Sequence, residues 1–523
     1  MSDARASETW TITKPAVESA HGLVASQHHV ASDIGAEVLA QGGNAIDAAV
    51  ATSLAIGTVE PWMSGLGGGG FMLIYRARED RVDAVDFGMR APLGLDPAFY
   101  PLTGGTASDL FGWPAVVDDR NLLGFPSMAA PGYIAGIALA LERFGTRGWE
   151  AMIAPAVDLA EEGMIADWYA TLLIATAARQ LSGFAESARV YLPGGFPPVG
   201  EWGAPPPHLK LGNLATTLRR LRDAGPRDFY EGQIARALIA DCQAGGSTLA
   251  AADLAGYQAR VLPTERAVHR GATIDVAPGL TAGPTLLAAL AALGDRASGD
   301  APSPGAYLGY AESLRGAYSE RLATMGDSNE ARAPSCTTHV NVVDRDGNFV
   351  ALTQTLLSLF GSKTMLPETG ILMNNGIMWF DPRPGRPNSI AAGKRPLSNM
   401  CPAIISRPDG VRIALGASGG RRIMPAVFQL TSFLCDYGMD VGAAFAQPRI
   451  DVSGTDIVGL DSRLGEGVVA ALGQSFAIRR DQHGVYPAMF ACPNAVSRSA
   501  DGHRHSGAAF ITSPWAKVSA PPS

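Results

Sequence analysis

The chain has 523 residues, 47% of them hydrophobic and 17% charged, and its 41 basic and 49 acidic residues give a formal net charge of -8. This composition is typical of a folded protein with a large buried core and argues against a disordered or fibrous chain. The basic residues form no long run, so neither a nucleic-acid surface nor an anionic membrane partner is expected.

The cysteines are scattered, odd in number and without a CxxC spacing: Cys242, Cys336, Cys401, Cys435 and Cys492. Such a set predicts reduced thiols rather than disulfides or a zinc site. The N-terminal segment has no apolar stretch like that of a signal peptide, and no hydrophobic run approaches the length that crosses a bilayer. These features predict a cytoplasmic protein with no bound metal and no membrane partner.

The N-terminal part predicts two helices followed by a strand. Ser32 is placed to cap a first helix that the glycine pair at 42–43 ends, and Asn44 is placed to cap a second helix. A glycine-rich loop at 65–70 then leads into the apolar run 71–75. A nucleotide-binding glycine loop needs the order strand, loop and helix, so this loop is not interpreted as a phosphate site.

The middle and C-terminal parts of the chain differ in pattern. Residues 131–260 are mainly helical, with turns at proline and glycine clusters. From 337 to about 415, short β-rich runs alternate with Asp-Gly and Gly-Gly turns, and mixed helical segments follow. This combination of helical and strand-rich segments indicates the α+β class.

The segment from Thr337 to Thr355 predicts a β-hairpin, because two β-branched runs flank an Asp-Gly turn. If Asp344 and Asn348 close a three-residue loop, the numbers of paired residues sum to 692 and Thr337 lies opposite Thr355. A two-residue turn would shift the register by one and still leave the two threonines near each other. Threonine is common in strands, so β propensity alone explains the hairpin without a catalytic role.

Longer motifs add a second line of evidence. The segment 337–348, TTHVNVVDRDGN, resembles the signature that opens the small subunit of gamma-glutamyltransferases. Other segments similar to that family follow in its order: 24–28 (VASQH), 42–49 (GGNAIDAA), 65–71 (GLGGGGF), 360–362 (FGS), 370–375 (GILMNN), 393–400 (GKRPLSNM) and 416–423 (GASGGRRI). The resemblance covers about residues 22–449, and its motifs are long and ordered.

The resemblance implies an autoprocessing N-terminal nucleophile. The chain would be cut between Cys336 and Thr337 into a large-subunit segment, 1–336, and a small-subunit segment, 337–523. The freed α-amino group, whose ordinary pKa is about 7.7–8.0, would act as the general base for the Thr337 hydroxyl. A hydroxyl needs such a base to be a nucleophile. By the same resemblance, Thr355 would hydrogen-bond and orient that hydroxyl.

The resemblance also implies the oxyanion hole and the fold. The backbone N–H groups of Gly419 and Gly420 would form the hole, a role that needs the close approach of glycine. The expected fold is an αββα sandwich of the N-terminal-nucleophile hydrolase type, with strands from both chain segments and no cofactor. His28, His29 and His339 are interpreted as structural hydrogen-bonding residues, because no ligand stands at a metal-binding spacing beside them.

The substrate-binding positions depart from the family pattern. Members that use glutathione hold the substrate α-carboxylate with two serines and an arginine, and the arginine position is Gly88 here. Arg90 stands two residues later, on the same face of an extended segment, and is the candidate carboxylate partner. The alternative is a surface arginine with no ligand. Ser398 keeps the first serine, whereas Asn399 replaces the second.

The positions that hold the substrate α-amine in those members are changed as well. They are Leu357, Gly376 and Trp379 here, and none offers a polar group to an ammonium. Leaving a buried charge without partners is costly. The segment 387–394 is short and lacks the insert that forms a lid in some relatives, so water can enter. These changes favour hydrolysis of a glutaryl-like amide, as in the cephalosporin-acylase-like branch of the family.

The sequence therefore predicts an amide hydrolase or acyltransferase for a small acyl group that bears a carboxylate, either γ-glutamyl or glutaryl-like. The alternatives are a true gamma-glutamyltransferase or glutathione hydrolase, and an uncleaved, inactive binding protein on the same fold. The joint presence of Thr337, Thr355 and the glycine pair at 419–420 argues against the last. The expected partners are a small-molecule amide and the two segments of the same precursor, without nucleic acid.

Overall fold

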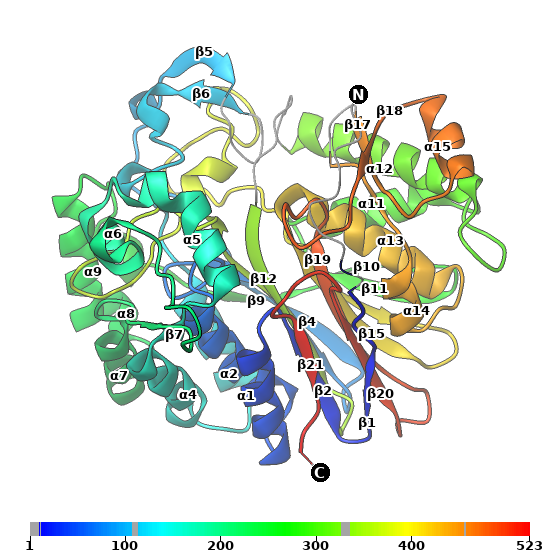
Figure 1. Ribbon diagram of the computed structural model, residues 1–523, viewed down its shortest axis with the longest axis horizontal. Helices are drawn as coiled ribbons and strands as arrows, with labels where there is room; N and C mark the ends of the chain where they lie inside the picture. The colour runs from blue at the N-terminus through cyan, green and yellow to red at the C-terminus, as the bar shows by residue number, and fades with distance from the viewer. Residues whose placement is uncertain (1–9, 11, 107–112, 326–334, 454–456, 523) are drawn as a thin grey trace.

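The computed structural model describes residues 10, 12–106, 113–325, 335–453 and 457–522, with the backbone alone at 335 and 336. Residues 1–9 and 11 of the N-terminal segment that is expected to lack a signal peptide lie outside the described residues. Two stacked antiparallel sheets, each of seven strands, form the centre of the molecule, with helices on both outer sides (Figure 1). The expected αββα sandwich is confirmed, and strands from both sides of Thr337 enter each sheet.

The sheet that carries the hairpin is called the β12 sheet. Its strands, in spatial order, are β21 (Lys517–Ser519), β2 (Gly22–Ser26), β12 (Ser335–Asp344), β13 (Phe349–Ser358), β3 (Gly69–Arg76), β4 (Arg81–Phe87) and β9 (Arg260–Pro263). The hairpin closes as a three-residue loop, in which Asp344 N donates to Asn348 O at 3.1 Å and Gly347 has a φ of +87°. Of the two predicted registers, the observed one pairs Val343 with Phe349 and so sums to 692.

The second sheet is called the β15 sheet. Its order is β1 (Val17–Ser19), β20 (His505–Ala509), β19 (Cys492–Arg498), β15 (Arg412–Ser418), β14 (Ala403–Ser406), β11 (Ala272–Val276) and β10 (Glu265–His269). Three small sheets lie outside the sandwich: β16 (Ile450–Asp451), β17 (Ile457–Asp461) and β18 (Ala477–Asp481); β5 (Leu102–Thr106) and β6 (Pro114–Val116); β7 (Met164–Ile165) and β8 (His208–Leu209).

The helices form the two outer layers. Those on the side of the β12 sheet are α1 (His29–Ala40), α2 (Ala45–Val59), α3 (Tyr133–Phe144), α4 (Trp149–Glu162), α5 (Trp168–Leu181), α6 (Ala185–Tyr191), α7 (Leu214–Ala224), α8 (Asp228–Glu231), α9 (Gln233–Ala244) and α10 (Ala251–Ala255). On the other side lie α11 (Gly283–Leu293), α12 (Pro304–Thr324), α13 (Ile423–Cys435), α14 (Val441–Ala446) and α15 (Glu466–Gly473) (Figure 1). None of the helices in the described ranges has both the length and the apolar character that crossing a membrane requires.

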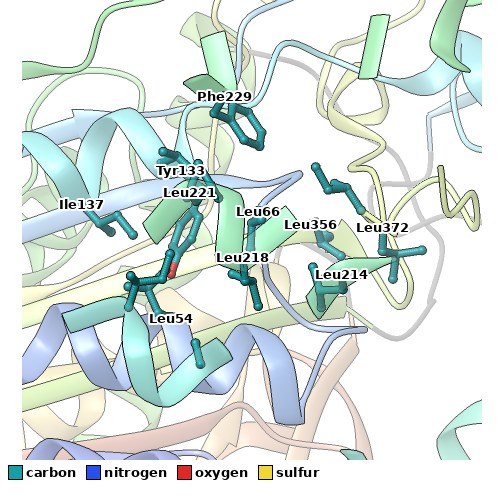
Figure 2. Close-up of a cluster of buried hydrophobic side chains, with 14 of the residues drawn as sticks. Leu54, Leu66, Tyr133, Ile137, Leu214, Leu218, Leu221, Phe229, Leu356 and Leu372 are labelled. Atoms are coloured by element: carbon teal, nitrogen blue, oxygen red, sulfur yellow. The ribbon is translucent and has the colours of Figure 1, made fainter. Parts of the chain in front are cut away.

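Burial of apolar side chains holds these four layers together. One core joins the N-terminal helices to the outer face of the β12 sheet and includes Leu54 and Leu356 (Figure 2). A second core fills the space between the sheets, with Leu73 from one and Val496 from the other. A third joins α11, α12 and α13 to the β15 sheet. Each fully buried large side chain contributes about 1.5–3 kcal/mol, so packing on both faces fixes the position of the hairpin.

The start of α2 agrees with the sequence prediction. The Asn44 side chain accepts the N–H groups of Ile46 and Asp47 at 3.0 Å, and the Asp47 carboxylate accepts Asn44 N at 2.8 Å. This reciprocal pair is a capping box and satisfies donors that a helix start leaves free.

The predicted cap of α1 is wrong. The helix begins at His29, and His28 Nδ1 accepts Val30 N at 3.3 Å, so His28 is the cap and has the structural role expected of it. Ser32 lies buried within the helix, where its hydroxyl contacts Ser26 Oγ at 2.7 Å. Ser32 therefore bonds to a residue outside the helix instead of capping it, and the local sequence pattern does not reveal that partner.

Candidate active site

The predicted nucleophile lies at one end of the central hairpin. Thr337 is 4% exposed, and its Oγ1 donates to Thr355 Oγ1 at 3.3 Å across the β12–β13 pair. Side chains alternate between the two faces of a sheet, so Thr337 shares a face with His339. A Cβ added to Gly416 of β15 would lie 2.2 Å from the His339 ring. Thr337 therefore faces the space between the two sheets.

A β-bulge interrupts the ladder beside Thr337. The register shifts between Cys336 and Thr338, so that β13 contributes two residues where a regular ladder has one. The N–H of Leu357 donates to Thr355 Oγ1 at 2.8 Å. Leu357 has a φ of +87°, a left-handed conformation that costs a leucine about 1–2 kcal/mol. The peptide bond before Thr337 thus lies where the regular pairing of the hairpin is broken.

The glycine-rich loop brings backbone close to β13 from the other side. A Cβ added at Gly68 would lie 2.4 Å from Thr355 O, and one at Gly70 would lie 2.2 Å from Thr353 O. A Cβ at Gly69 would lie 3.0 Å from Met89 N. Side chains at Gly68 and Gly70 would push the loop and β3 away from β13. A side chain at Gly69 would push β3 away from the segment that follows β4. The glycines are therefore required by close backbone packing beside Thr355.

The predicted oxyanion glycines lie at the same end of the sandwich. Gly419 and Gly420 follow β15 with φ values of +130° and +58°, a region that glycine adopts at little cost. They lead into a single 3-10 turn, Gly420–Arg422, which lies against β12. Gln27 follows β2, and its Nε2 donates to Ser418 Oγ. This hydrogen bond links the residue before the glycine pair to the β12 sheet. The structure brings Thr337, Thr355 and this glycine pair to one region.

A buried carboxyl group lies on the opposite face of β12. Glu60 ends α2, is 3% exposed, and its Oε2 accepts the Thr338 hydroxyl at 3.3 Å. Burial raises the pKa of Glu60 to about 8, although the Thr338 hydrogen bond acts in the opposite direction. Glu60 is therefore a neutral acid at neutral pH, beside the residue that follows the predicted nucleophile. Glu60 has no role predicted from the sequence, because one glutamate at a helix end carries no sign of burial.

A cavity of about 220 Å³ opens on the face of the β12 sheet that carries Thr337. Phe71 lines it and pairs with Thr353, whose hydroxyl contacts His339 at 2.8 Å on that inner face. The cavity is also lined by Gly88, Met89, Trp379, Ser398 and by the charged residues Asp86, Arg260 and Arg395. It therefore combines an apolar wall with a charged end.

Ser398 alone of the three predicted substrate residues lines this cavity. Asn399 follows it and is 9% exposed. Arg90 turns elsewhere: its Nη2 donates to Asp253 O at 3.1 Å, and its guanidinium carbon lies 5.9 Å from the centre of the Tyr257 ring. This position gives no support to Arg90 as the carboxylate partner.

The three positions expected to lack amine-binding groups are buried. Leu357 and Trp379 are 3% and 4% exposed. A Cβ added at Gly376 would lie 2.8 Å from Ala129 Cβ and 2.9 Å from Met89 Sδ, so a residue with a side chain does not fit there. These three positions therefore offer no polar side chain to a substrate amine.

Known proteins resemble this chain over most of its length. The family model described as Gamma-glutamyltranspeptidase matches residues 31–336 and 328–511. The glutathione hydrolase proenzyme of Bacillus subtilis (strain 168) is 30% identical over 490 residues, 82% of this chain and 80% of the relative. The acylase ACY 1 proenzyme of Pseudomonas sp. (strain SE83) is 32% identical over 501 residues, 88% of each chain. The crystal structure of cephalosporin acylase from Bacillus halodurans has the same fold, with a TM-score of 0.85 at 21% identity over 100% of both chains.

The Thr337–Thr355 contact predicts that loss of the Thr355 hydroxyl lowers kcat, whereas loss of a neighbouring hydroxyl does not. Replacing Thr355 by valine keeps its shape but removes the hydroxyl that meets Thr337 and accepts Leu357 N. We expect kcat of the processed enzyme to fall about 100-fold, because the nucleophile loses an orienting contact. The matched control is Thr353→Val, which removes a buried hydroxyl on the same strand and face and should keep kcat near normal. Normal turnover by processed Thr355→Val would contradict this role.

The buried Glu60 carboxyl predicts a pH-dependent stability. Its folded pKa, about 8, lies above its ordinary value of 4.5, so its stabilising contribution is full below pH 4.5 and is lost as the pH rises through 8. Glu60→Gln stays neutral and should escape this loss. The thermal midpoint of Glu60→Gln minus that of the wild type should therefore grow between about pH 5 and about pH 9. A difference that does not change with pH would contradict the burial of an ionisable Glu60.

Proposed function

The chain belongs to the gamma-glutamyltranspeptidase family of amide hydrolases and acyltransferases, and we propose that it is a proenzyme that cuts itself between Cys336 and Thr337. The contact that carries this proposal is the 3.3 Å approach of the Thr337 and Thr355 hydroxyls beside the bulge. In the cut, Thr337 Oγ1 attacks the carbonyl carbon of Cys336, the C–N bond breaks, and an ester replaces the amide. Water then hydrolyses the ester and leaves segments 1–336 and 337–523.

The cut creates the group that turnover requires. The new α-amine of Thr337 takes the hydroxyl proton as Thr337 Oγ1 attacks the substrate carbonyl, and returns a proton to the leaving amine. The N–H groups of Gly419 and Gly420 stabilise the oxyanion, and their left-handed backbone supports this assignment because it is built for close approach. Attack by water on the resulting acyl ester releases the acid and restores the amine and hydroxyl.

The proposed substrate is an amide of an acyl group with one carboxylate and no α-amine, of which glutaryl is the reference case. An α-ammonium would face buried Leu357, Trp379 and the closed space at Gly376. The amide oxygen beside Gly376, Asn374 Oδ1, already accepts the N–H groups of Ala129 and Gly376. The cavity contains one acid, Asp86, and two arginines already bind it. A buried ammonium without a partner is strongly disfavoured.

Hydrolysis, rather than transfer to a second amine, is the proposed outcome. The segment 387–394 is short and is pinned at its start, where Asn388 Nδ2 donates to Trp379 O at 2.7 Å and Leu397 N donates to Asn388 Oδ1 at 3.1 Å. Such a segment offers no lid to keep water out of the acyl-enzyme. We also propose that the enzyme works in the reducing cytoplasm, since Cys242, Cys401, Cys435 and Cys492 are free.

The test of this function is a comparison of two anilides that differ in one amine. Processed enzyme should hydrolyse glutaryl 4-nitroanilide with a kcat/KM about tenfold or more above that of γ-glutamyl 4-nitroanilide, because the second must bury an unpaired ammonium. Adding glycylglycine as an acceptor should not raise the rate. A preference for the γ-glutamyl compound would instead identify a true gamma-glutamyl hydrolase or transferase. No turnover of either by a chain that stays intact would support a binding protein.

A further inference from the structure

Three charged side chains in the cavity are not used by the chemistry above. Arg395 Nη1 donates to Asp86 Oδ1 at 3.1 Å, and Arg260 Nη2 donates to Asp86 Oδ2. Among the described residues that line the cavity, these are the charged ones. Two guanidinium groups against one carboxylate leave a net charge of +1 at this end of the cavity. Because Asp86 is 5% exposed and engaged on both oxygens, it is not available to a cationic ligand.

The Arg395 guanidinium lies where a side chain at position 88 would point. A Cβ added to Gly88 would be 3.5 Å from Arg395 Nη1, and the same Nη1 donates to Gly88 O at 2.6 Å. Nη2 donates to Gln258 O at 3.3 Å, and the side chain keeps 20% of its surface exposed. An arginine has five N–H donors, so donors are left for a ligand in the cavity.

A series of neighbouring residues on adjacent strands of the β12 sheet connects the proposed nucleophile, Thr337, to Gly88. Thr337 contacts Thr355, and Thr355 pairs with Gly69 of β3. Gly69 in turn lies against the residues that flank Gly88, since its added Cβ would be 2.8 Å from Phe87 O and 3.0 Å from Met89 N. These contacts form a continuous row of residues that leads from Thr337 to Gly88 and Arg395. Phe71, Met89 and Trp379 provide apolar contacts for its methylene groups.

On the basis of the proposed function, we propose that Arg395 is the carboxylate-binding residue for the acyl group, held in place by Asp86 and assisted by Arg260. It supplies from the 393–400 segment the cation that position 88 lacks, and the net charge of +1 matches a single carboxylate. A guanidinium binds a carboxylate through two parallel hydrogen bonds, which fixes the orientation of the acyl chain. The ligand class is a linear acyl group that ends in a carboxylate.

The experiment compares glutaryl 4-nitroanilide with its terminal carboxamide, a neutral analogue of the same length. The quantity measured is the ratio of kcat/KM for the carboxylate to that for the carboxamide, within each processed enzyme. We expect Arg395→Met to lower this ratio about 30-fold or more, mainly through KM, because the cation that pairs with the carboxylate is gone. Lys394→Met is the matched control: Lys394 is an exposed cation one residue away and outside the cavity, so the ratio should stay as in the wild type.

Two further variants keep the test decisive. Arg260→Met changes a half-exposed residue, 51% exposed in its side chain, and lowers the net charge from +1 to zero, so it should lower the ratio by a smaller factor. If Arg395→Met fails to fold or to process, an unchanged ratio in Arg260→Met overturns the proposal. So does an unchanged ratio in processed Arg395→Met. A ratio that falls in Arg90→Met but not in Arg395→Met would assign the role to Arg90 and also overturn it.

The proposed function and this inference fail in different measurements. A wild-type enzyme that prefers γ-glutamyl to glutaryl anilide contradicts the amine-free substrate. The carboxylate preference is then measured with γ-glutamyl 4-nitroanilide and its α-carboxamide, and Arg395→Met must still lower it for the assignment of Arg395 to stand.

Discussion

The structure depends on the pairing of β12 in the middle of a seven-stranded sheet. β2 pairs with it over 341–344 and β13 over 338–343, so the strand is held on both edges away from Thr337. At Thr337 the ladder breaks at the bulge, and the two hydroxyls meet there. A chain cut before Thr337 therefore keeps its pairing, and only the end of the strand is released. The same arrangement supports a peptide bond that can be cut and a nucleophile that stays in place afterwards.

Desolvation keeps two buried titratable groups of the β12 region neutral. Burial lowers the pKa of His339 to about 3 and raises that of Glu60 to about 8, so both are neutral at pH 7, on opposite faces of the strand. Charged groups are instead gathered at the far end of the cavity, where Asp86 binds Arg260 and Arg395. Neutral buried groups beside β12 and a net positive charge in the cavity suit an acyl group with its amide at one terminus and a carboxylate at the other.

The sequence predicted what local patterns and long motifs specify. The hairpin, the Asn44 cap and the αββα architecture follow from turn chemistry, capping and the ordered family motifs, whereas the choice between the two possible registers came from the structure. It did not predict Glu60 or the group at Asp86, because their roles come from burial and from contacts between segments far apart in the chain. Arg90 matched an expected pattern of alternating side chains, yet its partner is the Asp253 carbonyl. Arg395 belongs to the 393–400 motif, but the sequence does not show that its guanidinium lies beside Gly88.

The mass of the purified chains tests most directly whether Thr337 becomes an N-terminal nucleophile. Intact-mass spectrometry of active wild-type protein should find segments 1–336 and 337–523, while Thr337→Ala should remain one chain of 523 residues without turnover. Thr338→Ala is the matched control, because it removes the neighbouring hydroxyl on the opposite face and should still process. Wild-type protein that hydrolyses anilides while it remains a single intact chain would contradict the account.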